Sequence, residues 1–380
     1  MMPTSRLAHC DQGDLRSTET HDCLRLITVA EPSWDRWLGL TDHDIYHGAA
    51  YHRIAEQNDE GRAFLAVFGT SSRFLAWPYL LRAVPDSARH AGRTDVTSVY
   101  GYAGPLALGM RGDPAFGTRA WAAVRLNWLR QGAVTAFTRF HPLLSNQRWL
   151  GDDPGVFELA PTVSIDLTTP DETAVRRYPR VLRQEIAAAR RRGLQTERDP
   201  GWDDLPDFVA MYNLTMRRAG AAGAYSFPAS YFERLRDELA DRASLFTTRL
   251  ADRVAAAGIF LEHGGVLHAH LVGSDPALRG LSPLKVLLDD VSSWGHSRGS
   301  RVLHLGGGRG GQADSLLEFK GRFSPERHPF SVGRWVLDET AYRRLSAESQ
   351  EAALRSGSDR DRHFFPAYRA PVASSGRDSS

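Results

Sequence analysis

The chain has 380 residues, 42% of them hydrophobic and 24% charged, which is typical of globular proteins and sufficient for two domains of ordinary size. Its 47 basic and 45 acidic residues leave a net charge of only +2, so a nucleic-acid binder that is basic over its whole surface is not indicated, although a local basic patch is compatible with this charge. No run approaches the roughly 20 apolar residues of a membrane helix, and the polar residues 1–22 lack the apolar core of a signal peptide.

Cysteine and lysine are both scarce. Cys10 and Cys23 form neither a metal-binding spacing nor a disulfide framework, which suits a reducing compartment, and we expect a cytoplasmic protein. Only two of the 47 basic residues are lysines, Lys285 and Lys320. A G+C-rich genome that favours arginine codons explains this imbalance. Lysine also offers a compact charge with a tunable pKa, which a guanidinium cannot, so a retained lysine is a candidate for chemistry.

Alternating and helical patterns divide the first half into strands and helices. They predict strands over residues 24–30, 64–69, 73–81, 134–140 and 162–167, and helices over residues 34–40 and 116–131. Thr70, Ser71 and Ser72 separate the second strand from the third and predict a hairpin there.

The clearest helix is predicted over residues 171–193, where Gly193 ends it. Its arginines, Arg176, Arg180, Arg183 and Arg190, follow spacings of four, three and seven, which place them near one face. A solvated helix face is the ordinary explanation for such a stripe. Contact with the phosphates of a nucleic acid is the alternative, and both remain open.

The second half repeats this order of elements. The patterns predict helices over residues 205–219, 228–239 and 283–298, and strands over residues 244–250, 255–262, 266–272, 301–305 and 330–337. The turn His263-Gly264-Gly265 joins two of these strands. A hairpin, then a helix, then a strand parallel to the last hairpin strand is the core order of N-acetyltransferase-like (GNAT) folds. In these folds a splayed pair of strands admits an amide-bearing substrate.

We therefore predict an α+β protein with two GNAT-like domains in tandem, residues 24–168 and 169–340. A disordered leader, residues 1–23, precedes them. A C-terminal extension, residues 341–380, follows, and its polar, serine-rich tail after Ala367 is expected to be disordered.

The strongest signal for chemistry is the glycine-rich segment from His304 to Phe323. Five glycines follow a predicted buried strand, and Asp314 is placed to cap the short helix that comes next. The segment lacks the Gly-Lys-Ser/Thr ending of a nucleotide P-loop and does not lie in the early βαβ unit of a dinucleotide-binding fold. Lys320 lies near the end of the short helix, where the helix dipole alone explains a cation.

Several stretches form a family pattern. They are the glycine run with Asp314-Ser315 and Phe319-Lys320-Gly321-Arg322-Phe323, and, as support, Tyr225-Ser226-Phe227-Pro228, His268-Ala269-His270 with Gly273-Ser274, and Val99-Tyr100-Gly101-Tyr102-Ala103-Gly104-Pro105. Together they resemble the Fem family of aminoacyl-tRNA-dependent peptidyltransferases. The resemblance extends over residues 24–337 and is firmer in the second half. It implies two N-acetyltransferase-like domains that move an amino acid from its tRNA ester to an amine, without ATP, metal or another cofactor.

The resemblance also implies site residues, with Phe319 and Lys320 at the reaction centre. We expect Lys320 to be the cation near the developing oxyanion or the terminal ribose–phosphate, and Asp314 to orient the amine or the lysine unless it only caps its helix. The candidate substrate-binding residues are Phe319, His304, Tyr225, Arg217, His270, Tyr102, Arg139 and His141. The stripe of Arg176, Arg180, Arg183 and Arg190 becomes a candidate tRNA contact.

Some of these residues also have structural explanations. His268 and His270 face the same side of one strand, and without a cysteine or carboxylate at ligand spacing they are better explained as core histidines than as zinc ligands. Arg139-Phe140-His141-Pro142 ends a strand and either binds the acceptor or anchors the domain junction. Tyr212, Arg217 and Tyr225 lie where a substrate could enter, although helix packing explains Tyr212 equally well.

The chain departs from the family's pattern in its first half. Family members that act on peptidoglycan precursors commonly carry an Asp three residues after the Pro of Gly-Pro, where this chain has Leu108. They also use an N-terminal lysine that has no counterpart here; the segment Asp44-Ile45-Tyr46-His47 through Tyr51-His52 occupies that region. There is no room for a coiled-coil arm. These departures weaken a cell-wall acceptor and favour another amine, including a small molecule of antibiotic biosynthesis.

Two other functions share this fold. An acyl-CoA-dependent N-acyltransferase holds pyrophosphate with a Gln/Arg-x-x-Gly-x-Gly/Ala loop, but Ala277-Leu278-Arg279-Gly280-Leu281-Ser282 keeps one glycine and loses the first and last positions. A catalytically dead double domain that only binds a partner is disfavoured by the intact Phe319-Lys320. We therefore expect an aminoacyltransferase whose partners are an aminoacyl-tRNA donor and an amine acceptor.

Overall fold

The computed structural model describes residues 22–85, 89–110, 113–168, 178–218, 227–355 and 364–371. The chain forms two compact units, the first from residues 1–157 and 331–380 and the second from residues 158–330. It passes from one unit to the other inside β7 (Val156–Asp166) and again inside β13 (Arg327–Val336). These units differ from the predicted domains, residues 24–168 and 169–340, because residues 332–336 of β13 pair with β6 (Ala133–Arg139) in the first unit.

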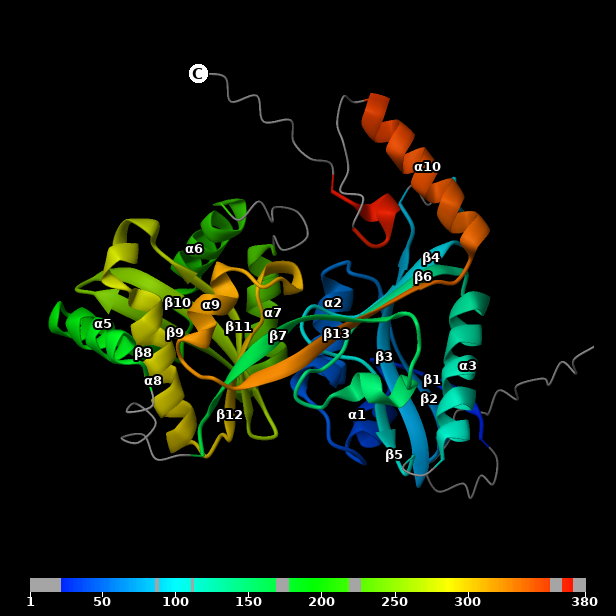
Figure 1. Cartoon of the computed structure of the whole chain (residues 1–380), viewed down its shortest axis with the longest axis horizontal. Coiled ribbons are helices and arrows are strands. Elements are labelled where there is room, and N and C mark those ends of the chain that lie inside the picture. Colours follow the sequence, from blue (N-terminus) through cyan, green and yellow to red (C-terminus); the bar gives the residue numbers. More distant parts are fainter. Residues whose placement is uncertain are drawn as a thin grey trace, which may run out of the picture. The chain divides into compact units, whose positions relative to one another are not determined.

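The first unit is built on a sheet with the strand order β1, β2, β3, β4, β6 and β13 (Figure 1). β1 (Leu24–Thr28), β2 (Arg62–Thr70) and β3 (Arg73–Ala83) are antiparallel neighbours, β5 (Leu106–Leu108) also pairs with β3, and β4 (Thr94–Thr97) is parallel to β6. The predicted hairpin at residues 70–72 is confirmed by β2 and β3. The described α-helices of this unit are α1 (Ser33–Leu38), α2 (Ala49–Gln57), α3 (Pro114–Arg130) and α10 (Glu339–Arg355).

Tryptophan rings fill the core of the first unit. Trp77 stacks on Trp121 with ring centroids 5.2 Å apart, and Trp128 and Trp335 meet Trp77 edge-on at 5.1 and 6.0 Å. Stacked and edge-on pairs of this kind add to the free energy gained by burying the rings. Because Trp335 lies on β13, a strand from the end of the chain completes the core of the first unit.

A second, smaller cluster anchors the C-terminal extension to the first unit. Tyr368 is buried, and its hydroxyl donates a hydrogen bond to the buried carboxylate of Asp95. The Nε of Arg369 lies 2.5 Å from the same carboxylate. A buried carboxylate is strongly destabilising without such partners. The expectation of disorder after Ala367 is therefore wrong for Tyr368 and Arg369.

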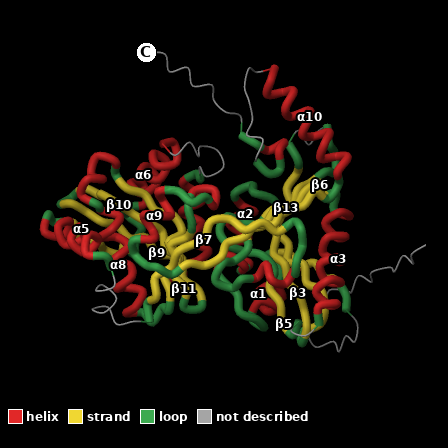
Figure 2. The backbone as a smooth tube through the Cα atoms, viewed as in Figure 1, coloured by secondary structure: helices red, strands yellow, loops and turns green. Residues whose placement is uncertain are grey.

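The second unit has the strand order β7, β12, β11, β10, β9 and β8. Figure 2 draws the strands of this unit in yellow and its helices in red. Its strands are β8 (Leu194–Asp199), β9 (Ala243–Leu250), β10 (Arg253–His263), β11 (Val266–Ser274) and β12 (Val302–Gly306), together with β7 from Glu158 onward. Its described α-helices are α5 (Arg180–Arg191), α6 (Leu205–Arg218), α7 (Ala229–Leu239), α8 (Pro283–Ser297) and α9 (Ser315–Gly321). The hairpin, helix and parallel strand predicted from the sequence correspond to β10–β11, α8 and β12.

Side chains alternate between the two faces of this sheet. Leu267 on β11 and Leu303 on β12 pack with Leu287 and Val291 of α8, in a core that also includes residues of α5. The intervening residues point to the opposite face, where His270 contacts Tyr231 of α7. One face of the second unit is therefore an apolar core, and the other carries polar side chains.

Two expectations about local structure need correction. The predicted helix over residues 171–193 begins at Arg180 instead, because the ring of Pro179 keeps the residue before it out of the helical region; residues 171–177 lie outside the described part. Cys23 is disulfide-bonded, contrary to the expectation from the cysteine spacing, while Cys10 lies outside the described residues. Among the helices that the structure describes, none combines the length and apolar character needed to cross a membrane.

Candidate functional site

Two neighbouring strands of the second unit separate partway along their length. β11 and β12 are parallel partners from Val266 to His268 and from Val302 to His304. Beyond these residues β11 continues beside β10 as far as Ser274, whereas β12 ends and the glycine-rich loop begins. His268 and His304 therefore lie at the vertex of a splayed pair of strands, as the sequence pattern predicted for this region.

One carboxylate closes the glycine-rich loop. Asp314 caps α9, and its Oδ1 accepts hydrogen bonds from the backbone N–H groups of Leu316 and Leu317, both at 3.1 Å. Its Oδ2 accepts from Nε of Arg309 at 2.8 Å. A Cβ on Gly308 would lie 2.5 Å from Asp314 Oδ1, so the loop needs glycine there. Burial acts to raise the pKa of Asp314, but the hydrogen bonds from Arg309 and Leu317 lower it to about 2, so this side chain is an ionised cap.

Lys320 reaches back from α9 to the end of β12. Its Nζ donates a 2.6 Å hydrogen bond to the carbonyl oxygen of Gly307, the residue that follows β12. Burial lowers the pKa of Lys320 to about 8, although the negative charge of Asp314 acts in the opposite direction. The ammonium is thus held beside the splay, with a pKa close to physiological pH.

The chain's other lysine has different surroundings. Nζ of Lys285 on α8 lies 2.7 Å from Oε2 of Glu185 on α5, and the lysine is buried between these two helices. This ion pair accounts for Lys285 as part of the helix packing. Lys320 is therefore the lysine with a candidate chemical role.

Polar side chains line the sheet face opposite α8, near the splay. Nδ1 of His268 lies 3.2 Å from Nδ1 of His304. Ser164 on β7 and His328 on β13 are joined by a 2.7 Å hydrogen bond, and the rings of His328 and His304 are 6.5 Å apart. His270 lies 3.5 Å from the hydroxyl of Tyr231, and burial, aided by His268, lowers its pKa to about 3. The predicted residues His304 and His270 thus share this face.

Phe319, the remaining predicted residue of the C-terminal motif, belongs to the apolar side of the site. Its ring meets that of Phe323 edge-on at 5.6 Å, and both pack against the core beside α8. Phe319 thus packs α9 against this core, and its contact with substrate remains a prediction.

Thr162 on β7 is a site residue that the sequence patterns missed. It is fully buried, and its hydroxyl has no hydrogen-bond partner among the described residues. A Cβ placed on Gly307 would lie 3.6 Å from Cγ2 of Thr162, so the threonine sits next to the carbonyl that holds Lys320. A buried hydroxyl without a partner costs free energy, and a substrate group would satisfy it. Nothing in the alternating pattern of β7 distinguishes this threonine from its neighbours.

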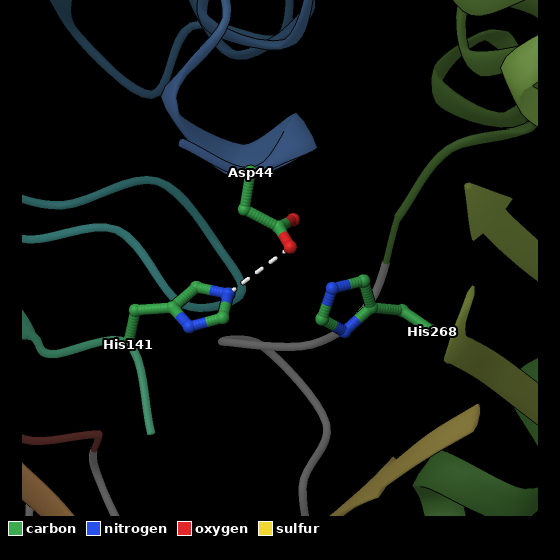
Figure 3. A group of neighbouring side chains, drawn as sticks. All are labelled: Asp44, His141 and His268. Atoms are coloured by element: carbon green, nitrogen blue, oxygen red, sulfur yellow. Dashed lines mark ion pairs between the residues drawn. The ribbon is translucent and has the colours of Figure 1, made fainter. Parts of the chain in front are cut away.

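Three other predicted substrate-binding residues, Tyr102, Arg139 and His141, lie in the first unit. Figure 3 shows the buried carboxylate of Asp44 facing His141, with Oδ2 3.2 Å from Nε2. Nδ1 of His141 accepts from the backbone N–H of Leu144, so in the neutral ring Nε2 is the nitrogen that carries the proton. The ring of Tyr102 stands edge-on to His141 at 6.2 Å, and the guanidinium of Arg139 lies 5.2 Å above Phe137. These contacts give each predicted residue a structural role in the first unit.

The first unit does not repeat the splay within its described residues. Its parallel strands β4 and β6 stay joined beyond their paired register, because the N–H of Ser98 donates to the carbonyl of Phe137 at 3.1 Å. The N–H of Arg139 donates to Oγ of Ser98, also at 3.1 Å, and Ala103 forms a parallel bridge with Phe140. The two units therefore share a strand order but not an opening between their strands.

The arginine stripe of α5 is only partly available for contacts. Arg180 and Arg183 are exposed, as a phosphate contact requires. Arg190 instead pairs with Asp289 at 2.8 Å and with Asp290, both on α8. A phosphate would have to compete with these carboxylates for Arg190.

The last three predicted site residues are Arg176, Tyr225 and Arg217. Arg176 and Tyr225 lie outside the described residues. Arg217 is exposed in the last turn of α6.

The segment before α8, where acyl-CoA enzymes of this fold hold pyrophosphate, carries a carboxylate. It forms a 3-10 helix, η4 (Pro276–Leu281), and Oδ1 of Asp275 accepts from the backbone N–H of Ala277 at 2.8 Å. Arg253 pairs with the same carboxylate. A negative charge that occupies the first N–H group of this turn opposes the binding of a pyrophosphate.

Comparison with known proteins agrees with this architecture. Residues 176–321 match the family model described as an acetyltransferase (GNAT) domain. A crystal structure of FemX is similar over 84% of this chain and 98% of that chain, with 13% sequence identity and a TM-score of 0.61. A conserved protein of unknown function from Bacteroides thetaiotaomicron VPI-5482 is similar over 82% of this chain and 99% of that chain, with 7% identity and a TM-score of 0.51. No curated protein matches the sequence. The predicted α+β fold is confirmed: the chain has a fold similar to that of FemX, and residues 176–321 match a GNAT domain.

Proposed function

We propose that the chain is an aminoacyl-tRNA-dependent transferase that joins an amino acid to an amine acceptor through an amide bond. The observation that carries this proposal is the ammonium of Lys320, bound to Gly307 at the end of the splayed strand β12. An aminoacyl ester of tRNA is already activated, so the protein has to position the amine and stabilise the charge that develops on the carbonyl oxygen. An ammonium has three N–H groups, and the bond to Gly307 leaves two for the oxyanion or the terminal ribose.

Two further observations support a tRNA donor. Arg180 and Arg183 present exposed cations on α5 that a tRNA backbone could contact. Asp275 occupies the turn that a pyrophosphate would need, which disfavours the acyl-CoA-dependent alternative. A charged tRNA as donor also implies that the reaction takes place in the cytoplasm. The acceptor is either a small-molecule amine or a peptidoglycan precursor, and Leu108 in place of the family's Asp favours the former.

The test is transfer from a charged tRNA. Purified protein is incubated with total tRNA charged with labelled amino acids and with a panel of amines, and labelled amide is separated from free amino acid. Parallel reactions contain acetyl-CoA, and thiol release is measured. We expect amide formation from the tRNA ester and no thiol release. Thiol release at ordinary turnover, with the tRNA ester intact, would reverse the order of the two donors.

A further inference from the structure

The transfer proposed above leaves one proton to be moved. An amine that attacks an ester carries an extra proton on nitrogen after the bond forms, and the intermediate returns to reactants unless a base removes that proton. Lys320, as the ammonium of the proposal, is unsuited to this task. Asp314 is held ionised by its cap bonds with a pKa of about 2, and His270 is a weak base with a pKa of about 3. A base elsewhere on the polar face of the second unit can take this proton.

The two histidines at the vertex of the splay have the geometry for proton transfer. His268 and His304 are the last residues at which β11 and β12 pair, so both rings lie where the two strands separate. Both side chains are buried, and their Nδ1 atoms are 3.2 Å apart with the rings at nearly a right angle. This inference rests on the proposed function. We propose that His268 and His304 form a proton relay that takes the proton from the attacking amine.

The Nδ1–Nδ1 hydrogen bond fixes how the protons are shared within the pair. Two bare nitrogens repel, and so do two protonated ones, so one Nδ1 donates and the other accepts. A neutral imidazole carries one proton, so the ring that donates through Nδ1 has an unprotonated Nε2. Two neutral rings joined in this way therefore present one unprotonated Nε2. When that nitrogen takes a proton, its ring can pass the Nδ1 proton to the partner ring.

The reaction then balances without another reactant. The amine nitrogen bonds to the ester carbon, and the carbonyl electrons move to the oxygen, beside Lys320. The basic Nε2 of the pair takes one proton from the nitrogen. The bond between carbon and the ribose oxygen breaks, the carbonyl re-forms, and the ribose oxygen leaves with the proton returned by the imidazolium.

Asparagine substitutions separate the relay from a merely structural pair. Asparagine places a hydrogen-bonding atom near the position of Nδ1, so His304→Asn and His268→Asn can keep the link between β11 and β12 while removing the base. The matched control is His296→Asn on α8, whose Nδ1 lies 2.7 Å from the carbonyl of Leu167, a bond that asparagine can also make. Single-turnover rates are measured with saturating charged tRNA and ethylamine, and thermal unfolding checks each fold.

We expect each vertex variant to lose about 10²- to 10⁴-fold in rate, the range typical of a general base, while the control keeps the wild-type rate. Because the two rings act as one unit, the double variant should be no slower than the slower single variant. In His304→Ala, added imidazoles should restore the rate in the order of their basicity. A near-wild-type rate in either asparagine variant, or rescue that follows the size of the imidazole instead of its basicity, overturns the relay.

The test of the acyl donor is separate from the test of the proton relay. A wild-type chain that uses acetyl-CoA and leaves charged tRNA intact would overturn the proposed donor only. An amine attacking a thioester loses the same proton, so the asparagine variants would then test the relay with acetyl-CoA.

Discussion

Replacing Lys320 by arginine tests the proposed reaction centre most directly, because it keeps a positive charge and changes only its shape. Arginine fills nearly every other cationic position of this chain, since only two of 47 basic residues are lysines. If Lys320 only favoured the end of α9, arginine would replace it at little cost. If Lys320 contacts the oxyanion, a wide, planar guanidinium cannot occupy the place of one ammonium.

The structure indicates the size of the effect. Nζ of Lys320 makes a 2.6 Å bond to Gly307, so the charge is held at one point beside the splay. Losing one preorganised donor to an oxyanion typically costs about 3 kcal/mol, or about a hundredfold in kcat. Burial that brings the pKa of Lys320 to about 8 also means that this site disfavours a permanent charge, and a guanidinium cannot lose its charge.

The assay is the rate of amide formation at saturating charged tRNA, for wild type and Lys320→Arg, with thermal unfolding as the folding control. Lys285→Arg is the matched variant, because Lys285 pairs with Glu185 in the helix packing, and an arginine can keep that pair. We expect a loss of about a hundredfold for Lys320→Arg and little change for Lys285→Arg. Equal rates for the two variants and wild type would remove Lys320 from the mechanism.

Other perturbations have expected outcomes of their own. The ammonium of Lys320 exists below its pKa of about 8 and is lost above it, so kcat with hydroxylamine, which is neutral over this range, should fall about tenfold per pH unit above pH 8, and this fall should be absent in Lys320→Arg. Thr162→Val should lower the rate without lowering the unfolding temperature, because the hydroxyl has no partner among the described residues; a lower unfolding temperature would indicate a structural bond instead. Reversing the charge of Arg180 and Arg183 together should weaken tRNA binding and reduce its salt dependence by about two phosphate contacts, and an unchanged slope would mark a solvated face. Arg369→Ala leaves a buried carboxylate with fewer partners and should lower the free energy of unfolding by about 3 kcal/mol, measured by denaturant titration.

Local signals in the sequence predicted much of the second unit. Asp314 is recognisable as a helix cap from its own side chain and the residues that follow, and the structure shows the predicted cap bonds. The splay of β11 and β12 followed from the order of hairpin, helix and strand. The helical spacing of residues 171–193 does not reveal the start of α5 at Arg180, because that start depends on Pro179, which keeps the residue before it out of the helical region.

Contacts between residues far apart in the sequence could not be predicted from such local signals. Thr162, Ser164 and His328 gain their importance only because β7 and β13 bring them to the same face as His304, and no local pattern connects these strands. The attachment of Tyr368 to Asp95 likewise joins residues far apart in the sequence. The spacing of residues within one helix or strand carries no information about such pairs.

The two crossings between units have a consequence for biosynthesis. A ribosome completes residues 158–330 before it makes residues 332–336 of β13 and the segment around Tyr368, which the first unit needs for its sheet and its buried Asp95. The second unit can therefore fold during translation, whereas the first, although its N-terminal part emerges earlier, has to wait for β13 and for Tyr368. A chain truncated after residue 330 and released from the ribosome would carry a protease-resistant second unit and a protease-sensitive first one.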